Sequence, residues 1–212
     1  VTCPPATSAW ATIEVQAIPI GGNLTANTSF CSTTNSGTLN LAGHSGGNVV
    51  FWETSTDCPA MATFTTLPPT TPTTHTYNNV SVTSCFRAVL RTSAGCEAKS
   101  TVATVSIFPA TVGGAVSAPQ TICSGDNVAP LNLTGQEGRV LRWESAAGCN
   151  FATVTTIAST QTTFTPTPAP TQTTGYRAVV QNGNCPPQNS SNVCITVEPP
   201  VSRGNVTAGE PV

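Results

Sequence analysis

The sequence carries little charge. Acidic and basic residues make up 8% of the 212 residues, and Lys99 is the only lysine. A typical soluble domain has about 25% charged residues. The net charge of −2 is scattered, without the basic cluster that binds nucleic acid or anionic lipid. A nucleic-acid partner is therefore not expected. No run of 18 apolar residues is present, so the sequence predicts no membrane-spanning helix.

Strong helix formers are also scarce, since methionine occurs once and leucine, lysine and glutamate are few. β-Branched residues dominate instead, threonine above all, together with 18 prolines and 17 glycines. β-Branched residues favour strands, and proline and glycine punctuate them with turns. This composition predicts an all-β protein of many short strands.

Motifs for chemistry are sparse as well. The sequence has no P-loop, no H-E-x-x-H motif and no C-x-x-C pair, which argues against nucleotide and zinc sites. We predict no catalytic, cofactor-binding or metal-binding residues, and therefore a protein that is not an enzyme. The charges that both halves of the chain share are Glu53 with Glu144 and Arg87 with Arg177, which we interpret as exposed cross-strand ion pairs.

The chain contains an internal duplication. Trp52 and Trp143, within GNVVFWET and GRVLRWES, are 91 residues apart, and CFRAVL at 85–90 recurs as GYRAVV at 175–180. Cys31 corresponds to Cys123 in the same way. Several anchors at one period indicate tandem modules.

The junction between the modules occurs three times, at residues 3–26, 96–118 and 185–208. The chain therefore divides into four parts. We expect the end of a preceding module, or a donor-type strand, at 1–19, two immunoglobulin-like (Ig-like) modules at 20–110 and 111–200, and the start of a following module at 201–212.

Alternating residues place the core of each module. Short strands with turn signals and a central tryptophan are typical of an Ig-like β-sandwich. The predicted core residues are Trp52, Trp143, Phe86 and Tyr176. In the strand at 140–144, the period of two also directs Leu141 inward.

These motifs, with I-C-S-G, W-E-S and T-T-x-Y-R-A-V-V as the best examples, resemble the tandem Ig-like repeats of large cell-surface adhesins in Bacteroidota. That group includes gliding-motility and type IX-secreted proteins, and the resemblance covers effectively the whole chain. It implies a structural repeat segment of a secreted cell-surface adhesin or extracellular filament, acting as a rigid spacer or fibre-forming element.

Nine cysteines predict disulfides and an oxidising, extracellular compartment. Repeats of this kind commonly keep the equivalents of Cys31 and Cys96. The resemblance therefore implies the four bonds Cys31–Cys96, Cys123–Cys185, Cys58–Cys85 and Cys149–Cys194, with the partner of Cys3 outside the chain and at most one free thiol. An Ig strand order alternatively favours Cys31–Cys58 and Cys123–Cys149, and Cys185 and Cys194 then bridge their own hairpin. A Cys85–Cys96 bond is excluded, because the two ends of that strand lie about 35 Å apart.

An unpaired strand is expected near the beginning of the chain, where WATIEVQ at 10–16 aligns with the closing strands of the modules. Its apolar residues Trp10, Ile13 and Val15 need a partner in water. We expect neighbouring modules or copies of the chain as partners in an end-to-end fibre, by chain continuity or by strand addition. Glycans and host or environmental surfaces are further candidate partners.

The alternative function is a carbohydrate-binding or accessory module of a secreted multidomain enzyme. An exposed aromatic platform would favour carbohydrate binding. Phe51 is the one outward-facing aromatic residue expected on a strand, and Arg142 replaces it in the second repeat. No cofactor is expected in either case.

Overall fold

We describe the protein from a computed structural model, which describes residues 1–200 except 26, 32, 33, 59 and 70. The chain forms two compact units. The first comprises Val1–Thr28 and Thr33–Ser106, and the second comprises Ser29–Ser32 and the chain from Ile107 onward. Strands and turns, without a helix, make up the described residues. The expected start of a following module at 201–212 lies outside them.

The first unit contains two sheets. The smaller sheet has the order β1(Asn23–Leu24), β3(Ser36–Ala42), β6(Thr74–Asn78). The larger sheet has the order β2(Thr28–Phe30), β9(Ala103–Ile107), β7(Ser84–Arg91), β4(Asn48–Ser55), β5(Thr65–Thr66), and β8(Glu97–Lys99) also pairs with β7.

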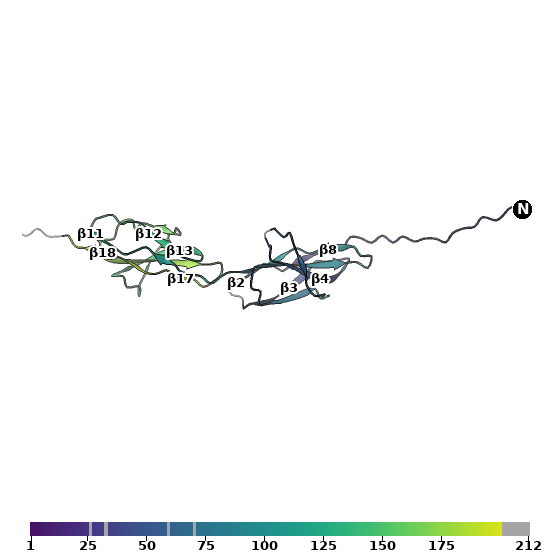
Figure 1. Cartoon of the computed structure of the whole chain (residues 1–212), viewed down its shortest axis with the longest axis horizontal. Helices are drawn as coiled ribbons and strands as arrows, with labels where there is room; N and C mark the ends of the chain where they lie inside the picture. Colours follow the sequence, from purple (N-terminus) through teal and green to yellow (C-terminus); the bar gives the residue numbers. More distant parts are fainter. Residues whose placement is uncertain (26, 32–33, 59, 70, 201–212) are drawn as a thin grey trace, which may run out of the picture. The chain divides into compact units, whose positions relative to one another are not determined.

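The second unit repeats this arrangement. Its smaller sheet has the order β10(Ala115–Val116), β12(Leu131–Thr134), β15(Thr163–Phe164). Its larger sheet has the order β11(Gln120–Cys123), β18(Val193–Glu198), β16(Thr174–Gln181), β13(Arg139–Ala147), β14(Thr155–Ile157), and β17(Gln188–Asn189) also pairs with β16. In Figure 1, β11 and β18 run side by side, as their parallel pairing requires.

The protein is therefore all-β, with two tandem Ig-like β-sandwich modules cross-linked by disulfides. Trp52 and Trp143 are both 0% exposed. Each indole N–H donates to a backbone carbonyl, that of Pro72 at 3.3 Å and that of Gln161 at 2.9 Å. A buried indole needs such a partner, because its N–H would otherwise be left without a hydrogen bond.

A β-bulge shifts the predicted alternation in the tryptophan strand. The pairing of β13 with β16 shifts between Val140 and Arg142, and the pairing of β4 with β7 shifts at the same place in the first unit. A bulge sets two residues against one, so the residues before it change faces. Val140 is therefore the buried core residue, and the prediction of an inward-facing Leu141 is wrong because this side chain is only half-buried.

Residues 1–19 form no strand in this chain, and they leave the sheets as a single trace toward the N-terminus (Figure 1). Trp10, Ile13 and Val15 are 86–100% exposed. The predicted strand at 10–16 is therefore absent here, because a strand requires a neighbouring backbone for its hydrogen bonds. Its pairing with another module or copy remains a prediction.

Candidate functional site

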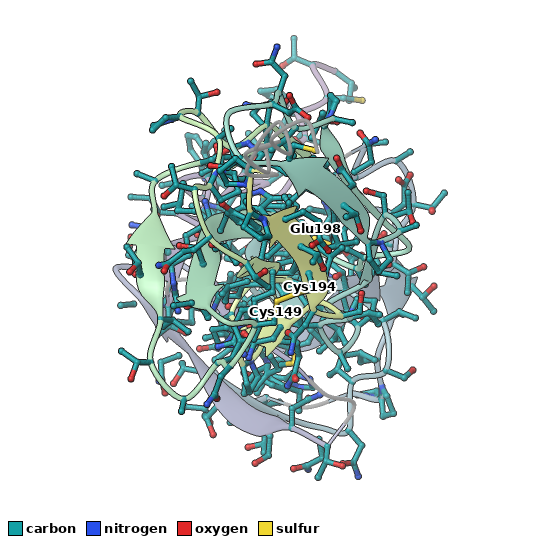
Figure 2. The ribbon with its side chains drawn as sticks, turned by 90° about the vertical axis from the view of Figure 1, so that its left-hand side faces the viewer. Cys149, Cys194 and Glu198 are labelled. Atoms are coloured by element: carbon teal, nitrogen blue, oxygen red, sulfur yellow. A yellow bond between two sulfur atoms is a disulfide. The ribbon has the colours of Figure 1, made fainter. Side chains whose placement is uncertain are left out.

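The two repeats have cysteines at several equivalent positions, but these cysteines form different disulfides in each repeat. Within the units, the structure contains Cys58–Cys85 and Cys149–Cys194, the same pairs as the sequence predicts. Figure 2 shows the second bond, with Cys194 and Glu198 on β18. Cys58 and Cys149 occupy equivalent positions, but their partners lie on different strands, β7 and β18.

One cross-strand pair shows the difference: the cysteine stands on one strand of the pair in the first unit and on the other strand in the second. Cys85 lies opposite Thr104 in the first unit, and Gly175 lies opposite Cys194 at the same place in the second. A side chain at Gly175 is disfavoured, because an added Cβ would come within 2.8 Å of the Phe151 ring and 2.9 Å of the Cys149 Cα. The half-cystine of the second unit therefore lies on the neighbouring strand.

The third disulfide differs from the predicted set. Cys31 is bonded to Cys185, 154 residues away, with a Cα–Cα distance of 4.7 Å. The predicted bonds Cys31–Cys96 and Cys123–Cys185 are wrong, and so is the alternative set with Cys31–Cys58, Cys123–Cys149 and a bridged hairpin of Cys185 and Cys194. The thiols of Cys3, Cys96 and Cys123 are free, so the expectation of at most one free thiol is also wrong.

The second unit shows why Cys123 cannot reach Cys185. Cys123 lies opposite Glu198 at the end of β18. Cys185 lies beyond the other end of this sheet, after β16 has run from its pairing with β18 at Thr174 to Gln181. Strands rise about 3.3 Å per residue, so the two cysteines are separated by most of the length of the sheet. Disulfide geometry requires a Cα–Cα distance below about 7 Å.

A second shared feature is a carboxylate beneath two cations. Glu144 is 3% exposed. Its oxygens accept hydrogen bonds from Arg142 and Arg177 at 2.7–2.9 Å. In the first unit, Arg87 pairs with Glu53, and Lys99 lies 3.8 Å from the same carboxylate. The predicted cross-strand ion pairs are confirmed, but both carboxylates are buried and not exposed as expected.

Burial alone would raise the pKa of Glu144, because it disfavours the charged form. The hydrogen bonds and positive charges of Arg142 and Arg177 outweigh burial and hold the pKa below its ordinary value. Arg177 in the second unit and Arg87 in the first each also contact an aromatic ring. Phe151 lies 4.7 Å from the Arg177 guanidinium, and Phe64 lies 3.7 Å from that of Arg87. The arrangement is a fixed ion network with aromatic cover.

The aromatic ring that stacks on each core tryptophan is not the same in the two repeats. His75 stacks on Trp52 at 5.2 Å, and Phe164 stacks on Trp143 at the same distance. Burial lowers the pKa of His75, because the charged imidazolium is disfavoured in this position. His75 is therefore a half-buried, uncharged aromatic ring against Trp52 at neutral pH.

The segment GHSGG at 43–47 fits the G-x-S-x-G pattern of serine hydrolases, a match that the sequence reasoning overlooked. In those enzymes the serine lies on a sharp turn between a strand and a helix. Here Ser45 lies in the turn between β3 and β4, and its backbone exchanges two hydrogen bonds with Ile20. The second repeat has no serine at this place, where its sequence is GQEGR. The segment is a turn between strands.

The described residues contain neither a metal site nor a membrane-spanning helix. Among them, no group of three or more His, Cys, Asp or Glu side chains is arranged to hold a metal ion. The same residues contain no helix that is long and apolar enough to cross a membrane.

The fold and its cross-links define a tandem pair of Ig-like modules. A family model described as Domain of unknown function (DUF8696) matches residues 20–109 and, a second time, residues 112–199. The chain belongs to this family. A search of curated proteins found no match.

Among solved structures, the chain is similar to the fibronectin(III)-like modules of Clostridium thermocellum CbhA, with 14% identity, 87% of this chain and 100% of that chain covered, and a TM-score of 0.39. Titin domains I67–I69, in an E-to-A mutated variant, give 12% identity, coverage of 84% and 64%, and a TM-score of 0.44. The chicken CNTN1 FN1–FN3 domains are 9% identical, with 84% of this chain and 67% of that chain covered and a TM-score of 0.33.

Proposed function

We propose that this chain is a structural, non-catalytic repeat segment of a secreted cell-surface adhesin or extracellular filament, where it acts as a spacer that resists extension. The sequence resemblance to Bacteroidota adhesin repeats supports the adhesin class. Neighbouring modules or further copies of the chain are the partners in an end-to-end fibre.

The observation that carries this proposal is the bond between Cys31 and Cys185. A pulling force that enters the chain before residue 31 and leaves it after residue 185 passes through this bond. The 153 residues between the two cysteines are then outside the path of the force. Extension of most of both repeats is therefore blocked covalently, whatever the strength of their sheets.

Two further features fit an extracellular spacer. Structural disulfides persist in oxidising compartments and are rare in the cytosol, and each repeat contains one within its own sandwich. The sequence has few charges and many threonines. Lysine and arginine are the residues that trypsin-like proteases require, and the sequence holds seven of them in 212 residues.

The experiment that tests the proposal locates the protein. Antibodies raised against the purified chain should label intact producing cells, on the surface or along extracellular filaments, under immunogold electron microscopy. Antibody preabsorbed with the chain is the control. Labelling that appears only after the cells are permeabilised would contradict an extracellular role.

A further inference from the structure

Two free cysteines have counterparts that are bonded to each other. Cys96 occupies in the first repeat the position of Cys185 in the second, and Cys123 occupies in the second repeat the position of Cys31 in the first. The structure contains the Cys31–Cys185 bond, while Cys96 and Cys123 are unbonded. One chain therefore contains a completed cross-link and both halves of another.

The completed cross-link shows what such a bond consists of. The second unit holds the segment Ser29–Ser32. Besides the disulfide, Asn184 donates its side-chain amide to the Ser29 carbonyl, and the backbone N–H of Phe108 donates to the Phe30 carbonyl, both at 2.8 Å. The unit thus receives a short segment with a cysteine at its third position, and Cys185 is fully buried in the result.

The first unit has the parts that receive such a segment. Cys96 ends a closed turn, in which Thr92 donates its backbone N–H to the Cys96 carbonyl at 2.9 Å. In the second unit the turn is one residue shorter, and the backbone N–H of Cys185 donates to the carbonyl of Asn182 at 2.9 Å. The counterpart in the first unit is the backbone N–H of Cys96, which donates to the Thr92 hydroxyl at 3.1 Å. Cys96 is half-buried and not fully buried like Cys185, so its thiol remains accessible.

The approach to this turn is also repeated. Gln16 lies four residues before the bridge at Ile20, as Phe108 lies four residues before the bridge at Val112. Gln16 donates to Ser93 at 2.9 Å and accepts from the Ala94 N–H at 3.3 Å. The chain at Gln16 is thus held beside the Cys96 turn. One contact lacks a counterpart, because a glycine, Gly95, stands at the position of Asn184.

The second unit has the segment that would be received. Residues 121–124, T-I-C-S, match residues 29–32, S-F-C-S. The backbone of this segment pairs with β18 in parallel, with Cys123 opposite Glu198, the residue at the end of that strand in Figure 2. The backbone is therefore held in an extended form, while the Cys123 side chain is exposed.

We propose that Cys123 of one copy forms a disulfide with Cys96 of a second copy of the chain, which reproduces the Cys31–Cys185 cross-link between copies. Donor and acceptor are different residues, so each copy can both give and receive. Such a head-to-tail contact extends into a linear polymer rather than closing as a symmetric pair. The inference deepens the proposed fibre function by naming its covalent link.

The chemistry is thiol–disulfide exchange. The two thiols lose two protons and two electrons as the S–S bond forms. An external low-molecular-weight disulfide, such as oxidised glutathione, takes up both and becomes two thiols, through a mixed-disulfide intermediate. The thiolate is the attacking species, and the accessible Cys123 is the side chain that first forms the mixed disulfide.

The test uses the full chain with Cys3→Ser, so that only Cys96 and Cys123 are free. Oxidation in a glutathione buffer should give a ladder of covalent oligomers on a non-reducing gel, which dithiothreitol collapses to monomer. Adding Cys96→Ser or Cys123→Ser should abolish the ladder. A mixture of these two variants should give one dimer band and nothing larger, because each supplies one half. Equal thermal unfolding of both variants confirms that they fold.

Peptide mapping then identifies the bond. The linked peptide from wild-type polymer must join Cys96 to Cys123. The inference is overturned by a dimer of either variant alone, by a Cys3–Cys123 linkage, by a monomer with an internal Cys96–Cys123 bond, or by monomers that stay reduced in the oxidising buffer. None of these results affects the immunogold test, so failure of the link and failure of the extracellular role are distinguishable.

Discussion

Removing the Cys31–Cys185 bond should lengthen the fully extended oxidised chain by a defined amount. In the oxidised wild type, the shortest covalent path between the chain ends runs from 1 to 31 and from 185 to 212, which is 57 peptide steps. At about 3.3–3.6 Å per step, this path reaches about 200 Å. The length follows from covalent connectivity alone.

The double variant Cys31→Ser, Cys185→Ser has a longer path. It runs from 1 to 58, from 85 to 149 and from 194 to 212, because the other two bonds remain, and it contains 139 steps. The extended chain should then reach about 480 Å, roughly 280 Å more than the wild type. Full reduction of the wild type adds the whole separation of 154 residues to the path, so the extended chain should gain about 530 Å over the oxidised wild type.

Single-molecule force spectroscopy, with handles at both chain ends and the free thiols alkylated, measures these lengths. The matched control is Cys58→Ser, Cys85→Ser. Its missing bond lies inside the closed loop, so its oxidised length should equal that of the wild type. The reasoning is refuted if the wild type extends to about 480 Å without reductant, or if the Cys31→Ser, Cys185→Ser variant stays near 200 Å.

Three further predictions concern stability within each unit. The pKa of His75 in the folded state lies below 6.5. The contribution of the neutral His75 side chain to folding stability is therefore complete above pH 6.5 and is lost as the pH falls through the folded pKa. His75→Phe, which copies Phe164, should remove this loss from pH-dependent melting curves; an unchanged pH profile would contradict it. Glu144→Gln should cost about 2 kcal/mol at neutral pH in urea unfolding. Because the pKa of Glu144 is lowered, the stability that its ionised carboxylate provides is present above pH 4.5 and lost as the pH falls through the folded pKa. A difference in stability between wild type and variant that persists in acid would therefore argue against the ion network. Trp52→Ala and Trp143→Ala should each cost about 3–5 kcal/mol, measured in the same way, and a loss below 1 kcal/mol at either would rule out its place in the core.

The repeated elements were predictable from the sequence. A period of about 91 residues aligns strands, tryptophans and cysteines at once, and a buried tryptophan in each repeat follows from that alignment. The bulge was not predictable, because a period of two counted back from Trp143 reaches Leu141, and nothing in the run V-L-R-W at 140–143 marks Val140 as the core residue instead. Only the pairing with β16 shows which residue is extra.

The Cys31–Cys185 bond could not be predicted for a different reason. Four cysteines per repeat suggest pairing within each repeat, and the resemblance to other repeats strengthens that assumption. The contact depends on residues 29–32 belonging to the second unit, which no local pattern encodes. The odd number of nine cysteines gave no signal either, because the predicted set already assigned Cys3 to a partner outside the chain.

The exchange of the half-cystine between β7 and β18 provides a matched pair of variants. In the first unit, Cys85 and Thr104 are cross-strand neighbours, with 3.5 Å between the sulfur and the hydroxyl oxygen. Cys85→Gly with Thr104→Cys should therefore still form a bond with Cys58, since a cysteine on either strand lies beside the same loop. Thiol counting on the unfolded, unreduced chain should stay at three, the wild-type number.

The reverse exchange in the second unit should fail. Gly175→Cys with Cys194→Thr places a Cβ within 3 Å of both the Phe151 ring and the backbone of Cys149, closer than real contacts allow. The loop must move before a bond can form, so thiol counting should rise from three to five. Adding Phe151→Ala, which copies Ala60 of the first repeat, gives the loop room and should return the count to three. If the reverse exchange forms its bond with Phe151 in place, crowding at Gly175 is not what directs the cysteine to the neighbouring strand.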